Sequence, residues 1–240
     1  TYDKLVEPTQ PIIFIPNQAN NFLWFSQKDG YHQWYKYDTS GKLLAKMKVA
    51  FEMTEWLGFD SKGEYGYAMG TGSNPTESHL FKIRLSDMSE TQITKVSGTH
   101  RVSISKSGKV FIDIYTNLTT PRRIDLINDT GKITKTLLNA SDPYADYNMG
   151  ITEVFTIPGE NGMPLHARLI KPSNFDASKK YPVVVYVYNG PHVQLVTNTY
   201  LGGASLWMHY LAQQGYLVFT VDGRGSANRG KAFEQAIHRQ

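Results

Sequence analysis

The sequence predicts a mixed fold, with part of a β-propeller in residues 1–140 and a doubly wound α/β sheet in residues 141–240. A pattern of strands that recurs every ~45 residues predicts the propeller. Two apolar, strand-sized segments separated by a short helical segment predict the sheet. With 240 residues, the chain is long enough for one large domain or two small ones.

Composition and charge exclude several classes of protein. With 40% hydrophobic and 19% charged residues, the chain is not expected to be disordered, collagen-like or a coiled coil. The 25 basic and 21 acidic residues are interspersed, so no nucleic-acid-binding tail is expected. There is no cysteine, and the seven histidines lack metal-ligand spacing, so we expect no disulfide, metal site or cofactor. No segment approaches the ~18 consecutive apolar residues of a membrane span.

Three turns define the repeat in the first part of the chain, at residues 16–19, 60–63 and 105–108. After each turn we expect three strands separated by loops. They lie at residues 22–25, 34–38 and 42–47 after the first turn, at 65–69, 80–84 and 91–96 after the second, and at 110–115, 123–127 and 132–138 after the third. With a short apolar strand before each turn, this makes four strands per repeat. Four strands are typical of a propeller blade, because such a small sheet buries its faces only against neighbouring blades. Three blades cannot close a ring of roughly four to eight, so part of the ring is expected to be missing. An antiparallel meander or sandwich is the alternative.

The pattern changes after a polar linker at residues 139–148. Residues 151–157 and 165–170 alternate around a Gly-rich turn and predict a hairpin. Residues 181–188 and 216–222 predict strands buried on both faces, as in a parallel sheet covered by helices. Residues 204–214 predict the helix between them, which ends at Gly215, and residues 231–239 begin another helix.

Sites in such sheets lie beyond the carboxyl ends of the strands. Two segments take that position, Tyr188-Asn189-Gly190-Pro191 and Asp222-Gly223-Arg224-Gly225-Ser226. The second resembles a dinucleotide-binding fingerprint, but Asn228 occupies its third glycine position and would hinder the close approach of a helix. We expect a structural role instead, with Asp222 paired to an arginine such as Arg224 or Arg229.

Tyr188 is the candidate for chemistry at the first segment. Its phenol, at the end of a buried strand, could donate a hydrogen bond to an oxyanion, although a tyrosine at a strand end more often contributes packing. The sequence contains no Gly-x-Ser-x-Gly nucleophile elbow. Ser205 fails that pattern and is expected to cap the helix that follows it.

Two motifs at the right spacing resemble the prolyl oligopeptidase family of serine peptidases, most closely its bacterial dipeptidyl peptidase IV type. They are Val187-Tyr188-Asn189-Gly190-Pro191 and Asp222-Gly223-Arg224-Gly225-Ser226-Ala227-Asn228-Arg229-Gly230. The likeness continues through residues 181–182 and 233–239. More loosely, it includes residues 26–35 of the propeller, so it covers essentially the whole chain.

The resemblance implies a propeller of about eight blades that caps an α/β-hydrolase domain, so that residues 1–140 are the last blades and residues 141–240 the start of the catalytic domain. It implies a serine exopeptidase that releases N-terminal dipeptides from peptides with a penultimate Pro or Ala. Tyr188 would be the oxyanion-hole donor, and Asn189, Gly190, Pro191, Asp222 and Arg224 would be structural residues near the site. The catalytic Ser, Asp and His would lie outside this chain, which should therefore be inactive alone.

The resemblance also implies peptide substrates, a homodimer and, by analogy, a periplasmic or secreted location. In the family's sheet order, the strand at residues 183–188 pairs with the strand that leads to the nucleophile, so we expect an exposed apolar edge here. Two alternatives remain open. One is a noncatalytic binding module of the same architecture, and the other is a prolyl endopeptidase or acylaminoacyl peptidase of the same family.

Overall fold

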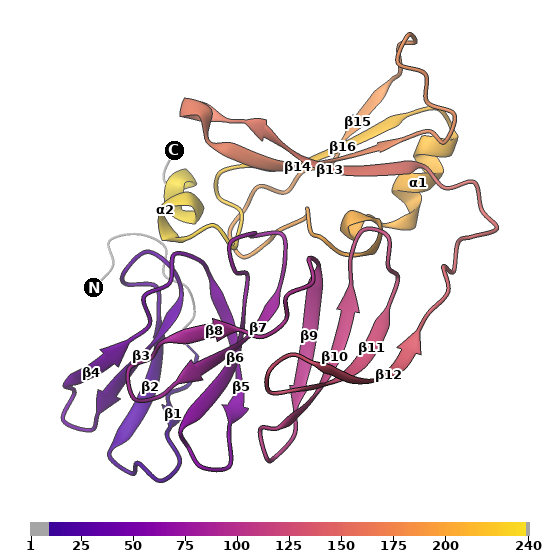
Figure 1. Ribbon diagram of the computed structural model, residues 1–240. Helices are drawn as coiled ribbons and strands as arrows, with labels where there is room; N and C mark the ends of the chain where they lie inside the picture. The colour runs from indigo at the N-terminus through magenta and orange to yellow at the C-terminus, as the bar shows by residue number, and fades with distance from the viewer. Residues whose placement is uncertain (1–9, 239–240) are drawn as a thin grey trace.

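The computed structural model describes residues 10–238, which form three antiparallel four-stranded sheets and one mixed four-stranded sheet (Figure 1). Blade 1 contains β1 (Ile13–Phe14), β2 (Asn21–Ser26), β3 (Gln33–Asp38) and β4 (Leu43–Lys46). Blade 2 contains β5 (Met53–Phe59), β6 (Tyr65–Gly70), β7 (His79–Arg84) and β8 (Glu90–Gln92). Blade 3 contains β9 (Thr99–Ile104), β10 (Val110–Thr116), β11 (Arg123–Asn128) and β12 (Ile133–Asn139). Strands pair in chain order within each blade, so the predicted repeat is confirmed.

The fourth strand of blade 2 is shorter than predicted. β8 ends at Gln92, whereas the sequence pattern extends to Val96. After Gln92, the N–H of Ile93 donates to the carbonyl of Leu80 at 2.7 Å, and the chain then crosses to blade 3. The apolar residues beyond Gln92 therefore belong to the crossing between blades, where the pattern alone does not show that the strand has ended.

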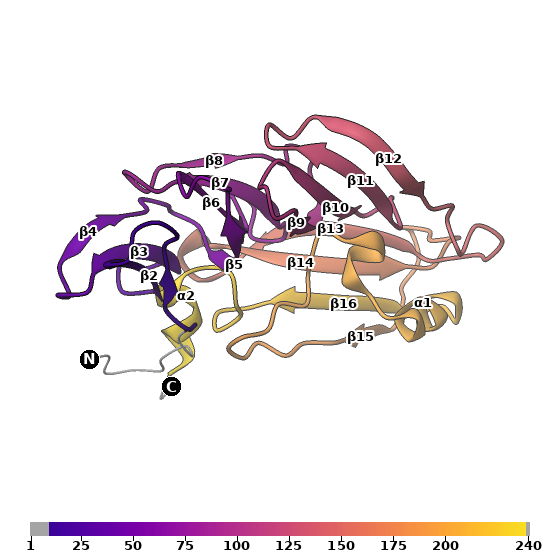
Figure 2. The same ribbon diagram turned by 90° about the horizontal axis from the view of Figure 1, so that it is seen from below.

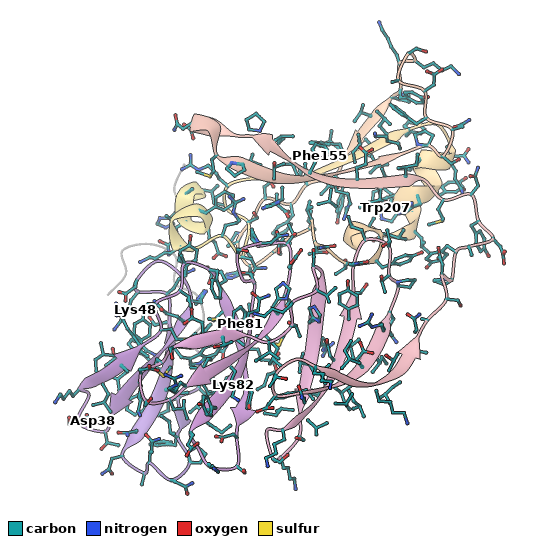
Figure 3. All side chains as sticks on the ribbon, viewed as in Figure 1. Asp38, Lys48, Phe81, Lys82, Phe155 and Trp207 are labelled. Atoms are coloured by element: carbon teal, nitrogen blue, oxygen red, sulfur yellow. The ribbon has the colours of Figure 1, made fainter. Side chains whose placement is uncertain are left out.

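Packing between blades explains why the repeat is needed. Blades 1 and 2 share one apolar core cluster, which includes Trp34 and Phe81, and blades 2 and 3 share a second, which includes Tyr67 and Phe111. Blade 2 therefore buries both faces of its sheet. Figure 3 labels Phe81 within blade 2, and full burial of such a side chain contributes about 1.5–3 kcal/mol to folding.

Blade 3 buries only one face in the described part of the chain. Along β10, Phe111 and Tyr115 are buried, whereas Val110, Ile112 and Ile114 are exposed. Successive side chains of a strand point to opposite faces of its sheet. The exposed face is thus apolar, as is expected of a surface that a further blade covers.

The mixed sheet has the strand order β13-β14-β16-β15, which Figure 2 shows side by side. β13 (Ile151–Pro158) and β14 (Pro164–Lys171) form the predicted hairpin, with the short helix η1 (Glu160–Gly162) in its turn. β14 pairs antiparallel with β16 (Leu217–Asp222), and β15 (Val183–Val185) pairs parallel with β16. The mixed fold class, a partial propeller followed by the start of an α/β domain, is confirmed.

Helices occupy the crossover between β15 and β16 and the segment after β16. The short helix η2 (Tyr200–Gly203) precedes α1 (Leu206–Gln213), and α2 (Lys231–Glu234) leads into η3 (Gln235–Ile237). Ser205 occupies the N-cap position of α1 as predicted, but its side chain makes no capping hydrogen bond. The ring of Trp207, labelled on α1 in Figure 3, contacts Tyr186 in an edge-on arrangement at 5.6 Å between centroids.

The prediction for residues 181–188 was wrong in two respects. β15 includes only residues 183–185, and Val183 and Val185 are exposed, whereas a strand buried on both faces was expected. β15 is the last strand of its sheet, so in residues 10–238 nothing covers its outer edge. The exposed apolar edge expected from the resemblance is therefore present. Its apolar side chains are Val183, Val185, Tyr186, Val187 and Tyr188.

The mixed sheet lies across one end of the blades (Figure 1). The segment from the end of β15 through η2 contributes to the contact, because the N–H of Asn198 donates to the carbonyl of Thr76 in blade 2 at 2.7 Å. The N–H of Leu201 donates to the carbonyl of Leu118 in blade 3 at 3.4 Å. No helix in the described part of the chain is long and apolar enough to cross a membrane.

Candidate functional site

The two segments predicted to carry the site lie at the same edge of the mixed sheet. β15 and β16 are parallel, with Val183 opposite Leu217 and Val185 opposite Phe219. The N–H of Tyr186 extends this pairing by donating to the carbonyl of Phe219 at 2.8 Å. Parallel strands end at the same edge of a sheet, so the first turn (residues 188–191) lies beside the second turn (residues 222–226).

Asn189 joins these two turns. Its side-chain oxygen accepts a hydrogen bond from the N–H of Gly223 at 2.8 Å, and its own backbone has φ 52°. Asparagine tolerates this left-handed conformation better than most residues. A Cβ at Gly223 would lie 3.2 Å from the Asn189 amide group, which is tighter than an ordinary contact. The predicted structural role of Asn189 thus has a specific contact.

Tyr188 presents its phenol at the exposed rim of this edge. The residue is 60% exposed, and no described residue forms a hydrogen bond with its hydroxyl group. Its ring lies against Gly190, where a Cβ would be only 2.6 Å from Cε1 of the ring. Gly190 therefore allows the ring to fold over the turn, and the hydroxyl group is left without a protein partner. The role of the phenol as an oxyanion-hole donor stays a prediction.

Asp222 is buried at the end of β16, but it does not form the predicted ion pair. Its two carboxylate oxygens accept hydrogen bonds from the N–H groups of Leu195 at 2.9 Å and Val196 at 2.8 Å. Burial raises the pKa of Asp222, although these two hydrogen bonds and the charges of Arg168 and Arg229 act in the opposite direction. The carboxylate faces two successive backbone N–H groups, which take the place of the expected arginine.

Arg224 forms its ion pair elsewhere. Its Nη1 atom donates to Oε2 of Glu160 in the turn of the β13–β14 hairpin. Both side chains are substantially exposed, so this pair contributes at most about 1 kcal/mol to stability. Arg224 therefore links the second turn to the hairpin, a contact that its position in the sequence did not indicate.

Arg168 is a buried residue of the site that sequence reasoning missed. Only 1% of its surface is exposed, and its Nη1 atom donates to the carbonyls of Leu195 at 3.0 Å and Gly202 at 2.6 Å. Its Nη2 atom lies 3.2 Å from Oγ1 of Thr220. Burial lowers the pKa of Arg168, and the nearby Asp222 carboxylate opposes this effect. The available signal was an arginine in the middle of a mostly apolar strand, where a charge is expected to be paired.

Arg168 and Asp222 together fix the segment that follows the first turn. Arg168 binds carbonyl groups of this segment, and Asp222 binds its N–H groups. Asn198 then fastens the same segment to the blades, because its Nδ2 atom donates to Glu77 at 2.8 Å and to Ser97 at 3.0 Å. The position of the first turn therefore depends on contacts with the propeller as well as on the sheet.

The second turn does not have the geometry of a nucleotide site. The side-chain amide of Asn228 donates to Oε1 of Gln194 at 2.8 Å, and the helix that follows, α2, has only four residues. In residues 10–238 no cluster of three or more His, Cys, Asp or Glu side chains could hold a metal ion. What this edge of the sheet offers is a phenol donor on a rigidly held turn, which can stabilise negative charge on a bound oxygen atom.

Comparisons with known proteins give consistent matches over both parts of the chain. Residues 1–122 match the family described as the dipeptidyl peptidase IV N-terminal region, and residues 204–240 match the prolyl oligopeptidase family. Human dipeptidyl peptidase 8 is 33% identical over 216 residues, which are 82% of this chain and 24% of that protein. Mouse dipeptidyl peptidase 8 is 32% identical over 182 residues, which are 71% of this chain and 20% of that protein.

Solved structures also resemble this one, and two of them illustrate the likeness. The structure of a dipeptidyl aminopeptidase IV from Bacteroides ovatus has a TM-score of 0.89 and 36% identity, over 97% of this chain and 36% of that one. Dipeptidyl peptidase 4 from Porphyromonas gingivalis has a TM-score of 0.81 and 26% identity, over 94% of this chain and 32% of that one. The chain spans about a quarter of the length of the curated relatives that it matches.

Proposed function

The chain belongs to the family of the dipeptidyl peptidase IV N-terminal region and continues into sequence of the prolyl oligopeptidase family, and on this premise we propose that the whole protein is a serine exopeptidase. It releases dipeptides from the N-termini of peptides with Pro or Ala in the second position. The observation that carries this proposal is the exposed phenol of Tyr188, which has no hydrogen-bond partner among residues 10–238, at the carboxyl end of a parallel strand.

In this mechanism Tyr188 stabilises the charge that forms on the substrate. A serine oxygen attacks the carbonyl carbon of the scissile bond, a histidine takes the serine proton, and the carbonyl electron pair moves onto oxygen. The Tyr188 hydroxyl group donates a hydrogen bond to this oxyanion. When the intermediate collapses, the C–N bond breaks and the histidine returns the proton to the departing amine. Water then hydrolyses the acyl-enzyme.

The other residues of the site hold Tyr188 and its turn in position. Asn189 fixes the first turn against the second, Gly190 gives room to the Tyr188 ring, and Pro191 restricts the exit of the chain. Asp222 and Arg168 hold the segment that follows. The 240 residues contain no Gly-x-Ser-x-Gly motif. The serine, its histidine and the acid are therefore assigned to sequence outside these residues, with residues 1–140 as propeller blades and 141–240 as the start of the catalytic domain.

The test is hydrolysis of Gly-Pro-p-nitroanilide by the full-length protein. We expect turnover that a serine-directed phosphonate abolishes, and no turnover of the same substrate with an acetylated N-terminus. Cleavage of the acetylated substrate would instead identify an endopeptidase or acylaminoacyl peptidase of the same family. Complete absence of hydrolysis, in a protein that is correctly folded by circular dichroism, would favour the noncatalytic binding module.

The family resemblance also supports a homodimer as part of this proposal. Light scattering coupled to size-exclusion chromatography of the full-length protein measures its mass directly. A mass of two chains is the expected result, and a mass of one chain at micromolar concentration contradicts it.

A further inference from the structure

A cavity of about 370 Å³ lies between blade 2 and the mixed sheet. The loop after β6 forms one wall, with Ser73 and Pro75, and the β13–β14 hairpin forms another, with Pro164 and His166. Arg229, shortly after the second turn, lies at the same cavity. Its volume is within the range of about 300–1,000 Å³ that is typical of small-molecule sites, and Tyr188 is not among the residues that line it.

Arg229 brings the positive charge to this cavity. Its guanidinium group lies over the ring of Phe233, with Cζ 4.3 Å from the ring centroid. Within residues 10–238 the group donates no hydrogen bond, and its Nη1 atom is buried without a partner. The carboxylate of Asp222, whose charge acts on Arg229, is engaged by the N–H groups of Leu195 and Val196. Arg229 is thus held in place by an aromatic ring. Its Nη1 atom is too deeply buried for a ligand to reach, so the donors that remain available are Nε and Nη2, which form no hydrogen bond within residues 10–238.

The other residues that line the cavity indicate which chemical groups an anionic ligand can carry besides its negative charge. The residues around the cavity include no Asp or Glu, so a ligand ammonium group would find no carboxylate partner there. Phe51, Pro75 and Pro164 give it apolar walls. Burial and the charge of Arg229 lower the pKa of His166, so this imidazole is neutral at neutral pH and can form hydrogen bonds without adding charge.

We propose that this cavity binds a carboxylate whose carrier has an uncharged body, with Arg229 as the partner of the anion. A guanidinium group presents two parallel donors that match the two oxygens of a carboxylate. The chemical class is an α-carboxylate next to an amide, which both N-acylated amino acids and the C-terminal residue of a peptide provide. The inference does not depend on peptidase activity, and its test measures binding alone.

The experiment compares N-acetylproline with N-acetylprolinamide by calorimetric titration of the full-length protein. The two probes differ only in the carboxylate, and we expect the acid to bind about tenfold more tightly or better. Arg229→Gln should reduce the affinity for the acid to that for the amide. Arg229→Lys keeps the charge but loses the paired donors. Its affinity for the acid should lie between that of the wild type and that of Arg229→Gln. Arg84→Gln is the control, because Arg84 lies outside the cavity and pairs with Asp87 on the surface.

Circular dichroism establishes whether each variant is folded. If Arg229→Gln does not fold, the affinity of Arg229→Lys for the acid still tests the proposal. An acetylated tripeptide with a free C-terminus distinguishes the two sources of the carboxylate. Tighter binding than N-acetylproline assigns the cavity to peptide C-termini, and equal or weaker binding assigns it to single N-acylated residues. Equal affinity of the wild type for acid and amide, or no binding of either up to about 10 mM, overturns the proposal. So does unchanged affinity for the acid in a folded Arg229→Gln variant.

Discussion

The side-chain oxygen of Asn189 and the backbone N–H of Gly223 form a 2.8 Å hydrogen bond that joins the turns at the ends of β15 and β16. The two residues are 34 positions apart in the sequence. Since Tyr188 immediately precedes Asn189, this bond limits the movement of the phenol relative to the second strand.

Substitution of Asn189 should separate the contribution of this bond from that of the backbone conformation. Asn189→Gly removes the hydrogen bond but tolerates φ 52°, so we expect a loss of about 1 kcal/mol in the free energy of unfolding. Asn189→Ala adds the strain of a left-handed alanine and should lose about 1 kcal/mol more. Urea denaturation measures both changes. Equal stability of the wild type and Asn189→Gly would show that the bond contributes nothing.

Substitution of Tyr188 should affect catalysis without affecting stability. In the full-length protein, Tyr188→Phe removes only the hydroxyl group, which has no partner among the described residues. We expect kcat to fall about 10²–10³-fold, because the lost donor acts on the transition state, while KM changes little. Thermal unfolding should give the same midpoint as the wild type. A wild-type kcat in this variant would remove Tyr188 from the mechanism.

His209 of α1 should make the protein less stable in mild acid. Burial, with the nearby charge of Arg168, lowers the pKa of His209 from its ordinary value of 6.5. The unfolded chain therefore binds a proton at this residue at a higher pH than the folded chain. Its contribution to stability is complete above about pH 6.5 and is lost as the pH falls, by at most about 1.4 kcal/mol per pH unit.

His209→Leu should therefore flatten the pH dependence of the free energy of unfolding between about pH 7 and about pH 5. Urea titrations at several pH values measure the slope. His192→Gln serves as the control, because the His192 side chain is 47% exposed, whereas His209 is buried. The same slope in His209→Leu as in the wild type would contradict the assignment.

The exposed edge of β15 should make the 240-residue chain associate with itself. An unpaired strand edge presents free N–H and C=O groups to other chains, and here the side chains are also apolar. Val185 is 60% exposed on this strand, so Val185→Lys should reduce association as measured by sedimentation velocity. Tyr147→Lys, at a residue of similar exposure in the segment between β12 and β13, should leave self-association unchanged. A monomeric wild-type chain at high concentration would count against association through this edge.

Some of the site could be predicted from local patterns. The run of apolar residues before Tyr188 and the run before Asp222 each indicated a strand, and strand direction then placed both turns at one edge. The position of Tyr188 followed from this reasoning, and its proposed role came from the family resemblance. The partner of Asp222 did not follow, because two successive backbone N–H groups at Leu195 and Val196 are not visible in any spacing of residue types.

The sequence by itself determined the strand repeat, the change to an α/β pattern near residue 150 and the two turns, because each depends on side-chain alternation and turn residues within a few positions. Only the tertiary structure decided where β8 and β15 end, which backbone groups bind the side chains of Asp222 and Arg168, and that the Arg229 guanidinium group lies at a cavity without a hydrogen-bond partner in residues 10–238. These features depend on contacts between segments distant in the sequence. Their energies arise from burial and hydrogen-bond geometry, which a local pattern does not contain.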